Sequence, residues 1–251
     1  MRCRTSALYT ALLAGALCIS GCGPKETEPE EPAAKEQTAV PEETQEAEPE
    51  TPTEEEKIET VYKDGLESTV CIFTPSGNNG TGFLYHGTYV ITNAHVLYDT
   101  DEFILMDQEG NEYTGTIVFT DDANDIAVIK TDGIHGTSVS FGNSNEIKAG
   151  DRLVMIGNPA DGKPFDFCKG QCLKPEEEFY QQMDPDGRYI ACDADLRSGY
   201  SGGPAFNLSG EVIGLSNAAF MADLSEYGYE HLSLIIPISR VISEIEENCG
   251  D

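Results

Sequence analysis

The sequence predicts an all-β domain built from two six-stranded antiparallel β-barrels and closed by one C-terminal helix. Short apolar runs of strand length recur along residues 66–236, with turn-forming residues between them. Helical periodicity is scarce between those runs, which disfavours a parallel sheet with crossover helices. The runs also fall into two groups of six, at about 66–145 and 146–236. This rough doubling is typical of paired antiparallel barrels or sandwiches.

The individual elements follow from these runs. Beyond Pro237, the side chains of Val241, Ile242 and Ile245 fall on one helical face, so residues 238–248 are expected to form an amphipathic helix. Turn signals rich in Gly, Asn and Asp separate several of the apolar runs. The predicted strands cover residues 70–73, 82–85, 89–92, 103–106, 114–120, 126–130, 152–156, 170–173, 189–192, 203–206, 211–216 and 232–236.

Residues 1–21 have the features of a secretory signal peptide. Arg2 and Arg4 give a positive start, and the apolar stretch over 7–19 is shorter than a membrane span. The stretch ends in ISGC (19–22), which resembles the lipobox of bacterial lipoproteins. The resemblance implies a lipid on Cys22 that anchors the protein, outside the cytoplasm, to a bacterial cell membrane. The alternative is an ordinary secretory signal with an incidental cysteine.

Residues 22–57 are expected to be a disordered acidic tether. This segment holds 13 Glu against three Lys, a net charge of −10, and it is poor in apolar residues. Such a composition cannot offset the entropy lost on ordering. The folded domain is therefore expected over 58–251, where the net charge is −22. This charge argues against nucleic acid as a partner.

Five cysteines remain in the predicted domain: Cys71, Cys168, Cys172, Cys192 and Cys249. Export permits disulfides, and an odd number leaves at least one thiol outside any pairing within the domain. A zinc site is the alternative, but the sequence contains no CxxC pair with a nearby histidine. We therefore expect no metal and no cofactor.

The densest cluster of glycines surrounds Ser201, in SGYSGGPAFNLSGEVIGL (198–215). Glycines on both sides of a serine allow the backbone to place N–H groups beside the hydroxyl. The N–H groups of Gly199 and Ser201 are the natural pair to stabilise an oxyanion. The alternative is a structural turn with an incidental serine.

A nucleophilic serine needs a base and a group that orients the base. Among four histidines, His95 alone follows a buried-looking strand, in TNAHV, whereas His86, His135 and His231 lie in turn-like or polar surroundings. Taken alone, His95 also fits a satisfied core residue. Asp125 directly precedes the buried run IAVI, which places it at the end of a strand.

Asp121 and Asp122 are rival orienting acids, but they fall in a turn. TNAHV, NDIAVIK and GYSGGP therefore give the chain order His, Asp, Ser. In this order the sequence resembles the trypsin-like (chymotrypsin-fold) serine endopeptidases, most closely the HtrA-type branch. The resemblance runs from about residue 66 to 248 and includes GTGFLY, GDRLVMIGNP and IIPISRVISEIEE.

The resemblance implies a peptide-hydrolysing enzyme that acts on polypeptides through an acyl-enzyme. It assigns His95 as general base, Asp125 as its orienting group and Ser201 as nucleophile, with an oxyanion hole formed by Gly199 and Ser201. Residues Ser216, Asn217 and Ala218 would bind substrate backbone by strand addition.

Specificity is weakly encoded in the sequence. Asp195 lies six residues before Ser201, where trypsin keeps the acid that selects Lys and Arg. Arg197 or Lys169 would be able to neutralise it. The polar segment 163–188 is a candidate lid over the cleft. A bridge from Cys168 or Cys172 to Cys192 would fix this lid, and Cys71 to Cys249 is a second possible pairing.

The sequence departs from the family at Tyr200, where the HtrA-type branch usually has Asn and trypsin has Asp. The ion pair that activates trypsin is therefore not expected. The sequence ends at residue 251, directly after the predicted closing helix, so the PDZ domain common in the HtrA-type branch is not expected either. Tyr200 also favours an alternative class of protein, a binding lipoprotein on a catalytically weak or inactive protease fold.

GYSGG also fits the nucleophile elbow of α/β-hydrolases. That fold requires a helix after the serine, followed by Asp and His, for which only Asp223 and His231 are available. The run after Ser201 is strand-like and short, so this alternative is disfavoured.

Overall fold

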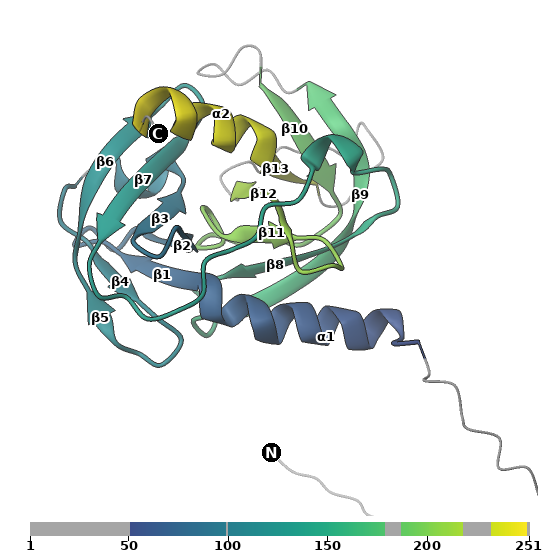
Figure 1. Ribbon diagram of the computed structural model, residues 1–251, viewed down its shortest axis with the longest axis horizontal. Coiled ribbons are helices and arrows are strands. Elements are labelled where there is room, and N and C mark those ends of the chain that lie inside the picture. Colours follow the sequence, from purple (N-terminus) through teal and green to yellow (C-terminus); the bar gives the residue numbers. More distant parts are fainter. Residues whose placement is uncertain (1–50, 99, 179–186, 218–231, 250–251) are drawn as a thin grey trace, which may run out of the picture. The chain divides into compact units, whose positions relative to one another are not determined.

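The computed structural model of the chain describes residues 51–98, 100–178, 187–217 and 232–249. They form two antiparallel β units with a helix at each end of the described chain (Figure 1). The predicted all-β fold class is confirmed. No helix in these four ranges is long and apolar enough to cross a membrane.

The first unit is a seven-stranded sheet in the order β5-β4-β1-β2-β3-β7-β6. All its neighbouring strands pair in antiparallel fashion. The short strand β5 follows a turn and was not predicted, so this unit has one strand more than expected. Its strands are β1 (Thr69–Phe73), β2 (Asn79–Tyr85), β3 (Tyr89–Thr92), β4 (Ile104–Met106), β5 (Glu112–Tyr113), β6 (Gly115–Asp121) and β7 (Ile126–Thr131).

The second unit is a closed six-stranded barrel in the order β10-β13-β12-β11-β8-β9. All six strands were predicted. Strand β9 is longer than expected because its polar residues pair with β8 first and with β10 later along its length. The strands are β8 (Arg152–Gly157), β9 (Asp166–Glu178), β10 (Arg188–Cys192), β11 (Pro204–Phe206), β12 (Val212–Asn217) and β13 (Ser233–Pro237).

Three hydrophobic clusters hold the domain together. One fills the first sheet, including Val90 and Leu105, and another fills the second barrel, including Met155 and Ile190. The third joins side chains of both units with those of the two helices. Helix α2 (Ile238–Cys249), confirmed where the periodicity predicted it, covers β12 and also contacts β6 and β7 (Figure 1). Apolar burial therefore fixes the two units against each other.

Helix α1 (Glu54–Gly65) is the main difference from the sequence prediction. The expected tether boundary at residue 57 falls inside this helix. Thr53 caps it, because its side chain accepts from Glu56 N at 3.3 Å while Glu56 Oε2 accepts from Thr53 N at 2.8 Å. Such a capping box satisfies two N–H groups at the helix start. Ile58 and Val61 are buried in the shared cluster, so the glutamates belong to an amphipathic helix.

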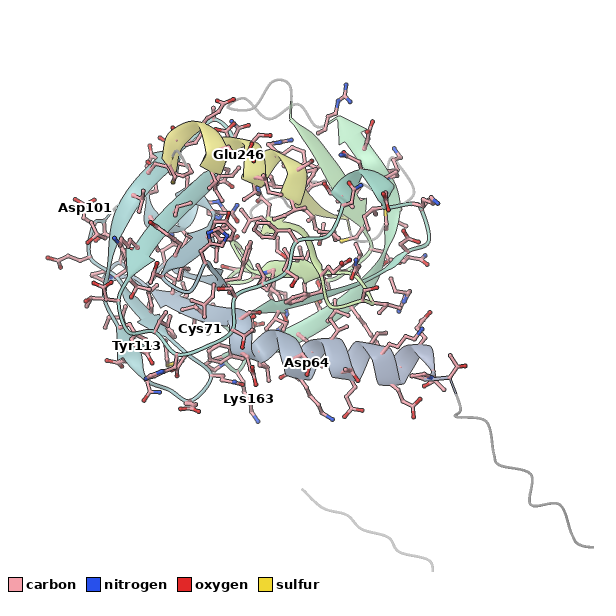
Figure 2. All side chains as sticks on the ribbon, viewed as in Figure 1. Asp64, Cys71, Asp101, Tyr113, Lys163 and Glu246 are labelled. Atoms are coloured by element: carbon pink, nitrogen blue, oxygen red, sulfur yellow. The ribbon has the colours of Figure 1, made fainter. Side chains whose placement is uncertain are left out.

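The cysteine pairings expected from the sequence do not form. All five cysteines among the described residues carry free thiols, and Cys71, Cys172 and Cys192 are buried. Cys172 and Cys192 are register partners across β9 and β10, yet each packs as a small apolar side chain in the barrel. Acidic side chains such as Asp101 lie at the periphery, whereas Cys71 lies in the interior (Figure 2).

Residues 163–178 and 187–188 of the predicted lid are described. Most of this part pairs within the barrel as β9 and the start of β10. Residues 179–186, the rest of the predicted lid, lie outside the described part, as do Cys22, Ala218, Asp223 and His231.

Candidate active site

His95 is positioned by a short 3-10 turn (Ala94–Leu97) that follows β3. Strand β3 pairs with β2 on one side and β7 on the other, so its end is held from both sides. The backbone N–H of His95 donates to Asp125 Oδ1 at 3.0 Å. The imidazole Nδ1 lies 2.8 Å from Oδ2 and 3.0 Å from Oδ1 of the same carboxylate. Ring and backbone of His95 are thus both fixed by one acid.

Asp125 occupies the last turn position before β7. Its φ of 56° lies in the left-handed region, where Asp is better tolerated than most residues. Asn93 Nδ2 donates to the Asp125 carbonyl at 2.8 Å, and Asn217 Nδ2 donates to Oδ2 at 3.1 Å. The side chain is only 19% exposed. Backbone and carboxylate therefore have separate partners that hold the acid toward His95.

Ser201 lies in the loop between β10 and β11 and is 6% exposed. Its carbonyl accepts from Thr81 N at 2.9 Å, which joins this loop to β2. The next residue, Gly202, lies so close to the end of β3 that an added Cβ would meet Thr92 Oγ1 at 2.2 Å and Asn93 N at 3.0 Å. The serine loop therefore packs on the strand end that carries His95.

The peptides of residues 197–201, which we call the oxyanion loop, have fixed orientations. The Ser198 carbonyl accepts from Ala160 N at 3.2 Å, and the Tyr200 carbonyl accepts from Gly203 N at 2.9 Å. In a trans peptide the following N–H points the opposite way. The N–H groups of Gly199 and Ser201 thus point away from the N–H groups of Ala160 and Gly203 that donate to these two carbonyls.

Gly199 is required by its conformation and by its surroundings. Its φ is +100°, and an added Cβ would lie 2.0 Å from the Asn158 carbonyl oxygen. Its own carbonyl accepts from Thr81 Oγ1 at 2.7 Å and from Asn158 N at 3.2 Å. Only glycine fits this position without moving the backbone.

Tyr200, the residue that departs from the family pattern, is fully buried in the second barrel. Its ring fills the space beside Gly157, where an added Cβ would lie 2.5 Å from Tyr200 Cδ1. Burial raises the pKa of the Tyr200 phenol, and the neighbouring Arg197 guanidinium opposes part of that rise. Tyr200 is therefore part of the packing beneath the oxyanion loop.

The predicted substrate-binding residues have different environments. Asp195 is exposed, and the two basic residues that were its candidate partners form ion pairs elsewhere. Arg197 pairs with Asp161 and Asp166. Lys169 pairs with Glu55. Ser216 is buried, and its N–H and carbonyl bond to Gly203 O and Gly202 N at 2.8 and 2.9 Å.

Asn217 ends β12 and directs its side chain to Asp125. This contact and that of Asn93 with Asp125 were not predicted from the sequence. The signal was weak: Asn93 lies within TNAHV beside the histidine, and Asn217 ends a strand whose other residues are mostly apolar.

The rival residues lie in other settings. Asp121 accepts from Ala123 N at 2.9 Å and Asn124 N at 3.1 Å, which makes it a turn-forming carboxylate. His86 stacks on Tyr85 with ring centroids 3.9 Å apart. Asp121 and His86 therefore have local structural roles.

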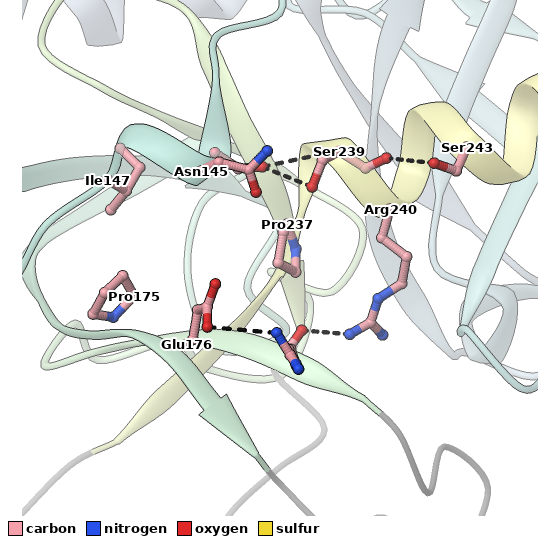
Figure 3. Close-up of a pocket in the computed structure, with 10 residues that line it drawn as sticks. Asn145, Ile147, Pro175, Glu176, Pro237, Ser239, Arg240 and Ser243 are labelled. Atoms are coloured by element: carbon pink, nitrogen blue, oxygen red, sulfur yellow. Dashed lines mark hydrogen bonds and ion pairs between the residues drawn. The ribbon is translucent and has the colours of Figure 1, made fainter.

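A separate cavity of about 350 Å³ lies beneath the start of α2 (Figure 3). Glu176, Arg188 and Arg240 line it, together with small polar and apolar residues. Arg188 pairs with Glu176 at 3.6 Å, and Arg240 donates to the Arg188 carbonyl. None of the candidate catalytic residues lines this cavity. No group of three or more metal-ligating side chains occurs within the described ranges.

A closed barrel and a second sheet, with a His–Asp contact and a serine loop packed on the same strand ends, define a chymotrypsin-like fold. The sequence pattern of the trypsin-like peptidase domain matches residues 80–215. The chain belongs to this family.

Curated relatives include probable periplasmic serine endoproteases described as DegP-like. The protein from Pseudomonas putida is 33% identical over 169 residues, which cover 65% of this chain and 33% of that protein. The one from Chlamydia pneumoniae is 32% identical over 170 residues, covering 66% and 34%. The chain thus spans about a third of the length of these relatives.

Solved structures share the fold. The HtrA-type protease AlgW with a decapeptide superposes with a TM-score of 0.66 at 19% identity, covering 76% of this chain and 67% of that one. The inactive form of a mutant of Rv3671c from M. tuberculosis gives a TM-score of 0.65 at 21% identity, covering 80% and 95%.

Proposed function

We propose that the protein is a serine endopeptidase that hydrolyses polypeptides outside the cytoplasm. The observation that carries this proposal is the double contact of the Asp125 carboxylate with the ring and backbone of His95, next to the Ser201 loop. An imidazole that donates its Nδ1–H to a carboxylate presents Nε2 as a proton acceptor. His95 would then take the Ser201 proton as the hydroxyl attacks a peptide carbonyl.

The steps after attack use the oxyanion loop. The Gly199 and Ser201 N–H groups would stabilise the oxyanion of the tetrahedral intermediate, a contribution that is usually large. His95 would return the proton to the leaving amine, and water would then hydrolyse the acyl-enzyme. Strand addition through Ser216 is disfavoured, because its backbone N–H and carbonyl are already hydrogen-bonded to Gly203 and Gly202.

We further propose that a lipid on Cys22 anchors the protein to a bacterial cell membrane. The names of the curated relatives support a periplasmic setting. The sequence around Cys22 supports the lipid. Replacing Cys22 with Ala should move the protein from the membrane fraction to the soluble extracytoplasmic fraction. Unchanged membrane association of that variant would contradict the anchor.

The purified chain provides the test of activity. Wild type should degrade unfolded casein and should be labelled by a fluorophosphonate probe, whereas Ser201→Ala should do neither. Ser209→Ala, at an exposed turn, is the matched control and should behave as wild type. Circular dichroism checks that each variant is folded. A folded wild type that neither labels nor cleaves would refute the proposal and favour a binding lipoprotein on a protease fold.

A further inference from the structure

Arg197, at the start of the oxyanion loop, is held by two carboxylates from another part of the chain. Its Nη1 lies 2.9 Å from Asp161 Oδ1, and its Nη2 lies 2.8 Å from Asp166 Oδ2. Asp161 belongs to residues 158–165, which we call the β8–β9 loop, and Asp166 begins β9. The planar guanidinium thus bridges two points of one segment, an arrangement that suits Arg better than Lys.

The same segment contacts two peptides of the oxyanion loop, alongside Thr81, whose Oγ1 also donates to the Gly199 carbonyl at 2.7 Å. Asn158 N bonds to the Gly199 carbonyl and Ala160 N to the Ser198 carbonyl, each at 3.2 Å. These two contacts orient the peptides that carry the N–H of Gly199 and of Tyr200. The β8–β9 loop is therefore a template for the oxyanion loop, and Arg197 is the side chain that ties the two together.

Tyr200 places its ring beneath this ion-pair group. The Arg197 guanidinium carbon lies 6.0 Å from the ring centroid, at the limit of a cation–π contact. The backbone N–H of Tyr200 also donates to the Arg197 carbonyl at 3.0 Å. Arg197 is thus connected to the oxyanion loop on one side and to its template on the other.

Helix α1 holds the far end of the template. Tyr62 stacks on Phe167 with ring centroids 4.3 Å apart, and its hydroxyl donates to the Phe165 carbonyl at 3.0 Å. Phe165 has a φ of 60°, a left-handed conformation that is unfavourable for a bulky residue. A backbone held in such a conformation needs support from its surroundings. The template is therefore braced from outside the barrel.

We propose that Arg197 is a positioning residue, which uses Asp161 and Asp166 to hold the oxyanion loop in the orientation that presents the Gly199 and Ser201 N–H groups. This inference rests on the proposed endopeptidase function. Without Arg197, Asp161 and Asp166 would repel each other in a domain of net charge −22.

The size of the effect follows from exposure. The Arg197 side chain is 37% exposed, and Asp166 and Asp161 are 39% and 70% exposed. Ion pairs this exposed are individually weak, so their loss shifts the loop population without unfolding it. We expect Arg197→Met to lower kcat about 3- to 30-fold, less than the loss of an oxyanion donor, which costs about 100- to 1,000-fold.

The experiment measures loop order and catalysis separately on the full chain. Hydrogen exchange followed by mass spectrometry reports on a peptide spanning residues 196–203, and steady-state kinetics on a casein-derived peptide give kcat and KM. The variants are Arg197→Met, Arg197→Lys and Asp161→Asn/Asp166→Asn. Arg152→Met is the matched control, since Arg152 pairs with Glu54 at 3.2 Å, away from the oxyanion loop.

Arg197→Met and the double Asp variant should speed exchange of that peptide and lower kcat, while KM changes less than about twofold. Arg197→Lys should recover part of kcat, and Arg152→Met should leave kcat and exchange unchanged. Unaltered exchange in Arg197→Met overturns the inference, whatever the activity of wild type. Faster exchange with unchanged kcat also overturns it. An inactive wild type refutes the proposed function instead, and the positioning role of Arg197 is then decided by hydrogen exchange alone.

Discussion

Asn217 Nδ2 donates to Asp125 Oδ2, the same oxygen that lies closest to His95 Nδ1. Asn217 ends β12 in the second barrel, whereas Asp125 and His95 belong to the first sheet. Asp125 is thus hydrogen-bonded to both units, and the position of its carboxylate depends on how the two units pack. Asn217 therefore connects the second barrel to the carboxylate that orients the imidazole.

Replacing Asn217 with Ala should lower kcat about 3- to 30-fold and should also lower thermal stability, because a buried hydrogen bond to a charged group is lost. The carboxylate would keep its two contacts with His95 but lose one of the donors that hold it, and a hydrogen bond to a charged group contributes about 1.5–3 kcal/mol. Steady-state kinetics on a peptide substrate measure the effect. Asn248→Ala, at an exposed position of α2, is the control. A variant with wild-type kcat would show that Asp125 needs no support from the second barrel.

Ile58→Ala should destabilise the domain by about 2–4 kcal/mol, because the removed side chain is 2% exposed and leaves a cavity in the shared cluster. Urea unfolding followed by circular dichroism measures the change. The neighbouring exposed residue gives the control, since Lys57→Ala should change stability by less than about 0.5 kcal/mol. If Ile58→Ala unfolds at the wild-type urea concentration, α1 does not belong to the folded domain.

The strands and the placement of His95 and Asp125 at neighbouring strand ends were predictable from the sequence, because apolar periodicity is a local signal. Helix α1 was not. Its glutamates continue the composition of the acidic segment before it, and only Ile58 and Val61 face the core. This amphipathic pattern is too short to predict a helix from the sequence, because most of the stability of such a helix comes from packing against the rest of the domain.

The long-range hydrogen bonds and ion pairs around the site were also not predictable from the sequence. Asn217 lies 92 residues from Asp125, and Arg197 lies 31 and 36 residues from its two carboxylates. Several acids near each basic residue offered equivalent partners in the sequence. Only the register of β8, β9 and β12 selects among them. For the same reason, the number of cysteines allowed several disulfide pairings in the sequence, and none of them forms among the described residues.

Asp107→Asn should destabilise the first sheet at pH 7 by about 1–2 kcal/mol. Burial raises the pKa of Asp107, but hydrogen bonds from Asn111, Tyr113 and Glu109 outweigh this and keep the pKa below its ordinary value. A lowered folded-state pKa stabilises the protein above the unfolded value of 3.8, and this contribution is lost as pH falls through the folded-state pKa.

The difference between wild type and Asp107→Asn should therefore shrink as the pH is lowered from 7 toward 3. Urea unfolding at several pH values measures this trend. Asp101→Asn, at an exposed position, is the control and should follow wild type throughout. A gap that stays constant or widens on acidification would contradict the stabilising role of the Asp107 carboxylate.

Iodoacetamide should alkylate Cys249 in the native protein and leave Cys71, Cys172 and Cys192 unmodified. Cys249 is exposed, whereas burial raises the pKa of Cys71 and Cys192 to about 12 and that of Cys172 to about 11. The thiolate is the reacting species, so these buried thiols are protected by both access and protonation. Peptide mass mapping before and after urea treatment tests this. A Cys172–Cys192 disulfide in non-reduced protein would contradict the packing of free thiols.

Tyr200→Phe should retain stability and activity, because the ring fills the space beside Gly157 and the hydroxyl contributes little to that packing. Tyr200→Ala should lose about 3–5 kcal/mol, as expected when a buried aromatic ring is removed. Tyr200→Asn, which introduces the residue usual in the HtrA-type branch, should lower both stability and kcat, since the surroundings are shaped for a ring. Urea unfolding and peptide hydrolysis measure the three variants side by side. If Tyr200→Asn instead raises kcat above that of wild type, Tyr200 suppresses catalysis, and the fold serves binding more than hydrolysis.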